Sequence, residues 1–311
     1  DKGLEIVSTK GKVSEWDKVY RSLNNPVDLN IPIVVLVNRS SASASEIVSG
    51  SLQDLDRAVI IGQRSFGKGL VQTSRPLTYN TQLKITTSKY YIPSGRCIQA
   101  KDYSHRNEDG SVGTVPDSLI REFKTKNGRK VYDGGGINPD ISLQVMEYSP
   151  ISRSLAENNI LFDFATSFRN KNESIGDAKK FQIDDALFAE FVAFAGTREY
   201  KYETESEQLL RKLKDAAEKE NYFNSFETEY NSLKEKMMHD KTQDIKKART
   251  EISRLLASEI ASRYSFQKGR IEQSFQTDPE IKRAIEVLND KTFYQDVLSG
   301  KYVEELKKKS K

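Results

Sequence analysis

One short stretch in the first third of the chain combines residue types that could carry chemistry. The stretch GQRSFGKG begins at Gly62 and has the G-x-x-x-x-G-K spacing of a phosphate-binding loop, with its lysine at Lys68. Such a loop needs a serine or threonine after the lysine to bind magnesium, and a helix whose amides face the phosphates. Here Gly69 follows the lysine, and residues 70–76 are strand-like up to a proline. The pattern therefore disfavours nucleotide binding and leaves Lys68 for another role.

A lysine offers a second kind of chemistry. An amine that is shielded from water loses its proton more easily and can act as the general base for a serine nucleophile. The chain has two histidines, His105 in a polar stretch and His239 in a highly charged one, and we interpret both as surface residues. This interpretation disfavours a Ser-His-Asp triad and makes Lys68 the candidate base.

Candidate nucleophiles lie upstream, where an apolar run leads into the small residues N-R-S-S-A-S-A-S-E. A serine between a buried strand and a helix would lie at the helix N-terminus, where backbone amides can stabilise an oxyanion. Serine-rich turns also cap helices, and Ser45 could have that simpler role. Spacing alone does not choose among the four serines of the turn, Ser40, Ser41, Ser43 and Ser45.

The elements that would position these residues are visible in the hydrophobic pattern. Apolar runs at 31–37 and 58–62 predict strands buried on both faces, and 82–92 predicts a longer strand rich in β-branched and aromatic residues. Residues 45–56 place their apolar side chains on one helical stripe. Residues 101–136 are interpreted as an extended polar loop with turn signals. This order of elements predicts an α/β region.

After residue 150 the chain becomes helical and highly charged. Apolar residues recur at spacings of three and four in two segments, 206–219 and 240–268. The first stripe comprises Leu209, Leu210, Leu213 and Ala217, and the second Ile245, Ile252, Leu255, Leu256, Ile260 and Tyr264. We predict a packed helical domain with solvated outer faces. A coiled-coil arm or a partner-binding surface is the alternative.

Composition excludes several classes of protein. The 311 residues include 49 basic and 45 acidic ones, a net charge of +4 that does not indicate nucleic-acid binding. The single cysteine, Cys97, excludes an internal disulfide. No apolar run approaches the ~18 residues of a membrane span, and no signal peptide is visible.

The motifs together resemble a known family. The segments N-R-S-S-A-S-A-S-E-I-V-S-G-S-L-Q-D and G-Q-R-S-F-G-K-G-L-V-Q are similar to the active-site region of the carboxyl-terminal processing proteases, the S41 family of serine peptidases. The resemblance implies that Ser43 is the nucleophile and that Lys68, neutral in a water-poor pocket, is its general base. It also implies that Gln72 orients the lysine and that the backbone amide of Ala44 donates to the oxyanion. No cofactor or metal is implied.

The resemblance also implies an architecture and a setting. Residues 1–148 would be the C-terminal part of a Clp-protease- or crotonase-like α/β core, and 149–311 a helical domain like that of members from Bacteroidetes-like bacteria. The chain would be a fragment that lacks the upstream part and its PDZ domain. Substrates would be proteins with free C-termini in the periplasm or cell envelope, and the helical region would serve an adaptor or self-association. The alternative is a non-catalytic protein-binding scaffold of the same fold.

Overall fold

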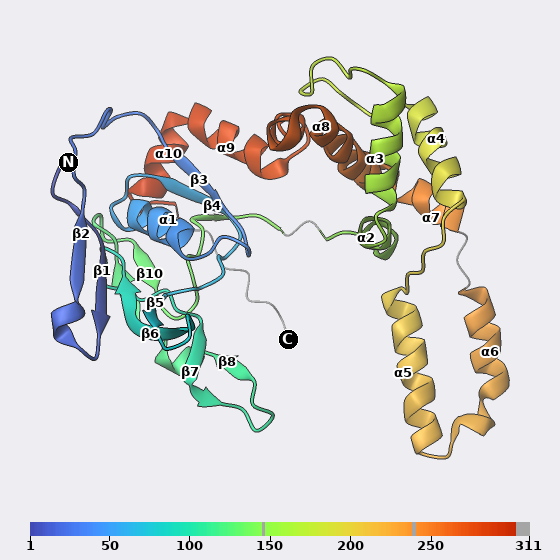
Figure 1. Cartoon of the computed structure of the whole chain (residues 1–311), viewed down its shortest axis with the longest axis horizontal. Helices are drawn as coiled ribbons and strands as arrows, with labels where there is room; N and C mark the ends of the chain where they lie inside the picture. The colour runs from blue at the N-terminus through green and yellow to red at the C-terminus, as the bar shows by residue number, and fades with distance from the viewer. Residues whose placement is uncertain (145–146, 238–240, 303–311) are drawn as a thin grey trace. The chain divides into compact units, whose positions relative to one another are not determined.

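The computed structural model describes residues 1–144, 147–237 and 241–302, and Figure 1 shows their helices and strands. The chain divides into two compact units. Unit 1 comprises Asp1–Val145 and Pro279–Lys311, and unit 2 comprises Met146–Asp278. Unit 1 contains sheets and helices, whereas the described residues of unit 2 form helices and no strands. The predicted order, an α/β region followed by a helical region, is confirmed.

An antiparallel sheet forms one layer of unit 1. Its strands lie in the order β2-β1-β6-β5. Their bounds are β1 (Glu5–Gly11), β2 (Lys18–Arg21), β5 (Leu70–Pro76) and β6 (Gln82–Tyr91), with a short 3-10 helix, η1 (Ser14–Trp16), between the first two. The run predicted as a strand over 82–92 forms β6, because β-branched and aromatic side chains fit a pleated surface. Strand β5 lies at an edge, so no other described strand of this sheet pairs with its outer side.

A parallel sheet forms the second layer, in the order β11-β4-β3. Its strands are β3 (Val34–Val37), β4 (Val59–Gly62) and β11 (Ile141–Ser142), and α1 (Ala44–Asp54) connects the first two. All four residues of β4 are buried, as expected for a central parallel strand covered on both faces. The predictions of strands at 31–37 and 58–62 and of a helix at 45–56 are therefore confirmed. The prediction that the first strand is buried on both faces is wrong, because β3 lies at the edge of its sheet and Leu36 is 38% exposed.

The prediction of an extended loop over 101–136 is wrong. Strands β7 (Lys101–Arg106) and β8 (Val112–Thr114) pair as one hairpin, and β9 (Glu122–Lys124) and β10 (Lys130–Tyr132) pair as another. A 3-10 helix, η2 (Asp117–Leu119), lies between them. The turn signals that suggested a loop are the hairpin tips, where Gly110 and Gly128 adopt the positive φ that such turns require.

Two C-terminal helices belong to unit 1. Helices α9 (Pro279–Asn289) and α10 (Lys291–Leu298) pack on the parallel sheet, where Val287, Tyr294 and Val297 are buried against β4. The predicted helical domain over 149–311 is therefore too long at its C-terminal end. Helical periodicity shows which face of a helix is apolar, but it does not show which part of the protein covers that face.

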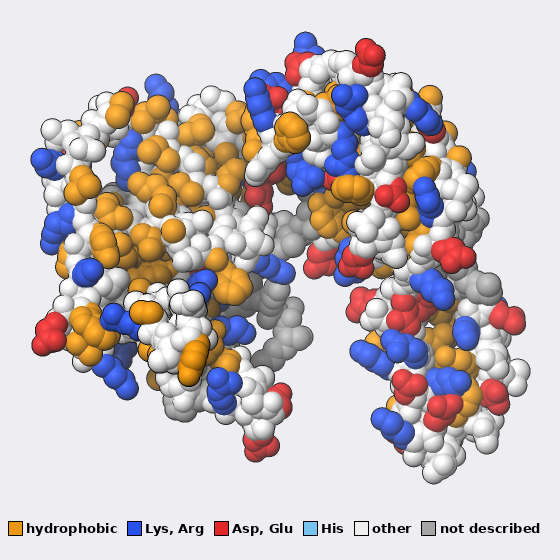
Figure 2. Space-filling model, viewed as in Figure 1, with side chains coloured by type: hydrophobic (Ala, Val, Ile, Leu, Met, Phe, Trp, Pro, Cys, Tyr) orange, Lys and Arg blue, Asp and Glu red, His pale blue; other side chains and the backbone are white. Residues whose placement is uncertain are grey.

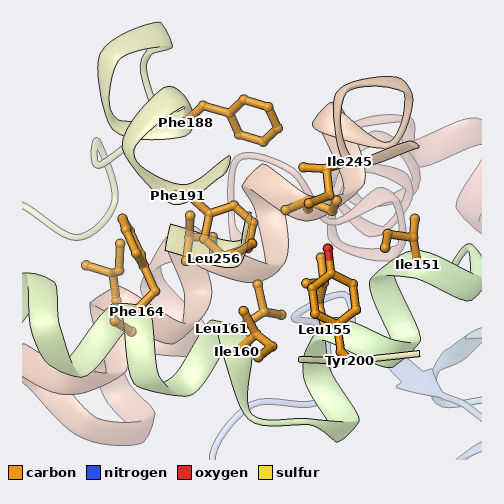
Figure 3. Close-up of a cluster of buried hydrophobic side chains, with 14 residues drawn as sticks. Ile151, Leu155, Ile160, Leu161, Phe164, Phe188, Phe191, Tyr200, Ile245 and Leu256 are labelled. Carbon is orange, nitrogen blue, oxygen red and sulfur yellow. The ribbon is translucent and has the colours of Figure 1, made fainter. Parts of the chain in front are cut away.

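Unit 2 is built around an aromatic and aliphatic core. The helices that enclose this core are α2 (Pro150–Glu157), α3 (Ile160–Lys171), α4 (Asp185–Gly196), α7 (Lys241–Lys247) and α8 (Arg249–Ser274). Figure 3 shows Phe164, Phe191 and Leu256 gathered from three of these helices. The rings of Phe164 and Phe191 meet edge to face, with 5.2 Å between their centroids. The predicted stripe over 245–264 supplies one wall of this core, with Ile245, Ile252, Leu256 and Ile260 buried.

The other predicted stripe is only partly buried. Helices α5 (Glu205–Lys219) and α6 (Glu227–Lys236), joined through the 3-10 helix η3 (Phe223–Ser225), form a helical hairpin. Leu210 is buried there, whereas Leu209 and Leu213 are 58% and 51% exposed. Figure 2 shows basic and acidic side chains interspersed over the two helices. The contact between α5 and α6 therefore covers only part of the apolar stripe on α5.

Candidate active site

Ser43 lies at the junction between the turn after β3 and the first turn of α1. It is the N-cap residue of α1, a place that the sequence also allowed for Ser45. Its φ of 60° lies in the left-handed region, which residues other than glycine rarely adopt. The turn is fixed by Ser41, whose hydroxyl accepts from the Asn38 amide at 3.1 Å and whose carbonyl accepts from the Phe66 amide at 3.0 Å. A strained residue held in this way is typical of functional sites.

The buried carboxylate of Glu46 joins the serine turn to the lysine loop. Its Oε2 accepts from the backbone amides of Ser43, at 2.9 Å, and Lys68, at 2.8 Å. Its Oε1 accepts from the Gly67 amide at 2.6 Å and from the Ser65 hydroxyl at 2.5 Å. Four donors compensate for the cost of burying this carboxylate. The backbones of the two candidate catalytic residues are thus fixed to one side chain.

Tyr90, on β6, makes a second connection between these two residues. Its hydroxyl donates a hydrogen bond to the carbonyl oxygen of Lys68. Burial, followed by the nearby charge of Glu46, raises the pKa of Tyr90, while a side-chain hydrogen bond with Ser43 acts in the opposite direction. The phenol therefore remains a neutral donor at physiological pH. The Tyr90 hydroxyl therefore contacts both the Ser43 side chain and the Lys68 backbone.

Both glycines that flank Lys68 are required by the packing of the loop. Gly67 has a φ of +84°, and a Cβ there would lie 2.4 Å from the Cβ of Ala100. A Cβ on Gly69 would lie 2.8 Å from the backbone nitrogen of Gln99. The Gln99 side chain accepts from the Gly69 amide at 2.7 Å and donates to the Lys101 carbonyl at 3.0 Å. The loop is therefore held closely on its inner side by the segment that leads into β7.

The side chains of Lys68 and Gln72 are exposed. The sequence analysis expected the lysine in a water-poor pocket, and the described residues do not enclose it in one. The hydrogen bonds given for Lys68 involve its backbone amide and carbonyl, and its side chain is left exposed. Lys68 precedes β5, which begins at Leu70, and Gln72 is the third residue of that strand.

The Ala44 amide has the features of an oxyanion donor. Ala44 is the first residue of α1 and is exposed. The Ser45 amide donates to the Ala42 carbonyl at 3.3 Å, and the amides of Glu46 and Ile47 both donate to the Ser43 carbonyl. Within the described chain no acceptor takes the Ala44 amide. A free amide at the positive end of a helix, one residue from the candidate nucleophile, is suited to a developing negative charge.

Sequence reasoning missed Glu46, Tyr90 and Gln99 because it looked for reacting groups and not for the groups that hold them. One signal was available, since a serine followed three residues later by glutamate is the pattern of a capping box. Tyr90 and Gln99 have no local signal. Of the two histidines, His105 lies on β7 and His239 lies outside the described residues. No group of three or more residues that could hold a metal ion is found in the described part of the chain.

Comparison with known families finds a match in each half of the chain. Residues 1–118 match peptidase family S41, and residues 151–288 match the family described as "Probable PDZ-protease, C-terminal helical domain". The first region is therefore similar to the S41 serine peptidases, as the motifs indicated. The comparison with bacteria of the Bacteroidetes type stays a prediction.

Individual relatives that match parts of this chain are also named as proteases. A carboxy-terminal-processing protease of Bartonella bacilliformis is 46% identical over 119 residues, which is 38% of this chain and 25% of the relative. A "Probable CtpA-like serine protease" of Staphylococcus aureus is 42% identical over 190 residues, 59% of this chain and 35% of the relative. The solved structure of a photosystem II D1 C-terminal processing protease is similar at 29% identity with a TM-score of 0.31, over 46% of this chain and 28% of that one. The chain thus spans about a quarter to a third of these relatives.

Proposed function

We propose that Ser43 and Lys68 form the catalytic dyad of a serine endopeptidase that cleaves proteins near their C-termini. The observation that carries this proposal is the shared carboxylate of Glu46, which accepts from the backbone amides of both residues. It is supported by the strained backbone of Ser43 and by the free amide of Ala44. Similarity to the S41 family supports the same chemistry.

In the proposed reaction the amine of Lys68 takes the proton from the Ser43 hydroxyl as its oxygen attacks the substrate carbonyl. The Ala44 amide donates to the oxyanion, an interaction worth about 3 kcal/mol when such a donor is removed. The C–N bond then breaks, the leaving amine takes the proton from Lys68, and an ester on Ser43 remains. Water, deprotonated by Lys68, hydrolyses that ester. Gln72, near the start of β5, positions the amine.

The dyad is tested by following cleavage of an unfolded protein on a gel. The wild type, Ser43→Ala and Lys68→Ala are compared, with Lys84→Ala as a matched control for an exposed lysine on β6. We expect the control to cut like the wild type and the two dyad variants to be silent. Cleavage by Ser43→Ala at the wild-type rate would refute the assignment of the nucleophile. A wild type that binds unfolded protein without cutting it would favour the non-catalytic scaffold.

The proposal extends to the whole protein. Because the chain spans only 25% and 35% of two of its relatives, we propose that the complete enzyme is longer than these 311 residues. The same assay on residues 1–311 and on a chain extended upstream tests this, and higher activity of the longer chain is expected. Equal activity of the two chains would contradict it.

Substrates, partners and location are also part of the proposal. Protein substrates with free C-termini follow from the processing activity of the relatives. The exposed Leu209 and Leu213 of α5 support an adaptor-binding or self-associating role for the helical hairpin. A periplasmic or envelope location follows from the family resemblance. Among the helices that the structure describes, none has the length and apolarity to cross a membrane. Light scattering of the wild type and Leu213→Ser tests self-association. Cell fractionation tests the location.

A further inference from the structure

The β5–β6 hairpin exposes large apolar side chains at the end that is far from the core. Residues 74–86 are exposed without interruption. Leu77 and Tyr79, at the turn between the two strands, are 54% and 96% exposed, and Leu83 and Ile85 on β6 are 47% and 40% exposed. None of these four side chains belongs to the hydrophobic clusters of the described chain. Packing within the described chain therefore does not explain them.

Tyr79 also occupies a backbone position that does not suit it. Tyr79 and Asn80 both have a φ of 56°, and they are the central residues of a turn in which the Thr81 amide donates to the Thr78 carbonyl at 3.2 Å. Hairpin turns of this kind prefer glycine, asparagine or aspartate, because a bulky side chain is strained at positive φ. The tyrosine ring gains no packing in return for this strain. A partner outside the described chain is therefore the better explanation for an aromatic residue here.

The charge around these side chains is one-sided. Residues 57–101 contain eight basic residues and no acidic one, although the whole chain has 45 acidic residues. Arg75 lies directly opposite Leu83 and shares its face of the hairpin, and its guanidinium lies 5.5 Å from the centre of the Trp16 ring. Trp16 is 45% exposed, and in its segment, 10–18, three lysines outnumber the two acidic residues beside the ring. We call these residues the tip patch: Trp16, Arg75, Leu77, Tyr79, Leu83 and Ile85.

We propose that the tip patch attaches the protein peripherally to a bilayer that contains anionic phospholipids. Tyrosine and tryptophan favour the boundary between headgroups and acyl chains, because one end of each side chain is apolar and the other is polar. A basic side chain next to them is attracted to anionic headgroups. Leu77 and Tyr79 at the end of an exposed hairpin can reach the acyl boundary of a flat surface. The contact lies at the membrane surface and needs no membrane-spanning helix.

Flotation of the 311-residue chain with vesicles tests this proposal. The vesicles contain phosphatidylcholine, with or without phosphatidylglycerol. We expect binding to the anionic vesicles alone, and weaker binding at high salt. Tyr79→Gly should weaken this binding at least about tenfold, since a half-buried aromatic ring is lost. The same variant should unfold at the same or a higher urea concentration, because glycine adopts positive φ without strain. Unchanged vesicle binding by Tyr79→Gly, or none by the wild type, would overturn the proposal.

A pair of charge variants provides the matched control. Arg75→Gln should weaken vesicle binding about fivefold, as the loss of one basic residue near an anionic surface gives. Lys124→Gln, at an exposed lysine of the β9–β10 hairpin, should bind like the wild type. Equal losses in the two variants would show general attraction of a cationic protein and would overturn the placement. Ser43→Ala should bind vesicles like the wild type, because the inference does not depend on the proposed dyad.

Tryptophan fluorescence locates the contact on the protein. Trp16→Phe combined with Tyr79→Trp places the single tryptophan in the tip patch. Trp16→Phe combined with Tyr132→Trp places it on β10, where the Tyr132 carbonyl accepts from Arg96, beyond the other end of β6. Brominated phospholipids should quench the first tryptophan and leave the second unchanged. Equal quenching of the two would overturn the proposal.

Two further outcomes would replace the bilayer with another partner. Retention of the chain on immobilised polyglutamate that Tyr79→Gly abolishes, without any binding to vesicles, would favour an acidic polypeptide. Loss of vesicle binding in a chain that is extended upstream would show that upstream residues cover the tip patch. Either result would overturn the inference.

Discussion

Glu46→Gln should destabilise unit 1 by about 3 kcal/mol and slow peptide cleavage without weakening peptide binding. Each carboxylate oxygen of Glu46 accepts from two donors. Glutamine retains the shape of the side chain but replaces one oxygen with an NH2 group, which cannot accept. Two hydrogen bonds to a charged group are therefore lost, each worth about 1.5 kcal/mol or more. Because the Ser43 and Lys68 backbones would no longer be fixed to one group, a shift of about 1 Å could lower kcat by about 100-fold.

The single tryptophan makes the stability measurement specific for unit 1. Trp16 lies in η1, so its fluorescence during urea unfolding follows unit 1 and is not mixed with the unfolding of unit 2. Glu122→Gln is the matched control, because Glu122 makes an exposed ion pair with Lys130, which is worth less than about 1 kcal/mol. Unfolding of Glu46→Gln within about 0.5 kcal/mol of the wild type would show that the carboxylate does not hold the two segments together.

Three further changes test other parts of the structure. Gly69→Ala should lower unit 1 stability by about 1 to 3 kcal/mol and impair cleavage, because its Cβ would lie 2.8 Å from a backbone nitrogen. Gly113→Ala, in the same unit, should be neutral or stabilising in urea unfolding, because its Cβ would lie 3.9 Å from the Asn107 side-chain oxygen. Burial raises the pKa of Cys97, so its alkylation should accelerate at higher pH than in the urea-unfolded chain. The unfolded thiol ionises first, so unit 1 stability should fall as the pH rises above the usual cysteine range. Phe191→Ala, in the core of unit 2, should cost about 3 to 5 kcal/mol by calorimetry.

Local sequence patterns predicted the helices and strands of unit 1 better than they predicted which of these elements pack together. The strand at 58–62 and the helix at 45–56 were predictable because periodicity and residue type are local properties. The α9–α10 pair was assigned to the wrong unit, because covering β4 is a long-range contact that no local pattern records. The hairpins within 101–136 were read as a loop because their strands are short and mostly polar. Their turns were correctly placed.

The same division applies to the candidate site. Ser43 and Lys68 were selected by their motifs, and Glu46 joins the turn and the loop that carry them. The roles of these residues remain predictions. The groups that join the two segments were not found, because Tyr90 and Gln99 approach the loop from positions that are more than 20 residues away in sequence. A tyrosine in a strand has many possible uses, and only the fold brings its hydroxyl to Lys68.

The exposed side chain of Lys68 leads to a last prediction about how the site would work. The backbone of the nucleophile and the Ala44 amide are already in place, whereas the amine that must lose its proton is in contact with water. A peptide that pairs along β5 and continues past its start would cover Lys68, and an amine shielded from water gives up its proton more easily. Substrate binding would then complete the base, and kcat should rise with peptide length more than 1/KM does.

This dependence can be measured with a series of peptides that share one cleavage site and extend by single residues along the β5 side. We expect a step in kcat at the length that first covers Lys68. Gln82→Ala, at the far end of β6, should leave the step unchanged, since that residue is remote from the face that is covered. If kcat is independent of peptide length while KM falls steadily, the added residues stabilise the bound substrate and the transition state equally. The neutral amine would then have to come from another part of the protein.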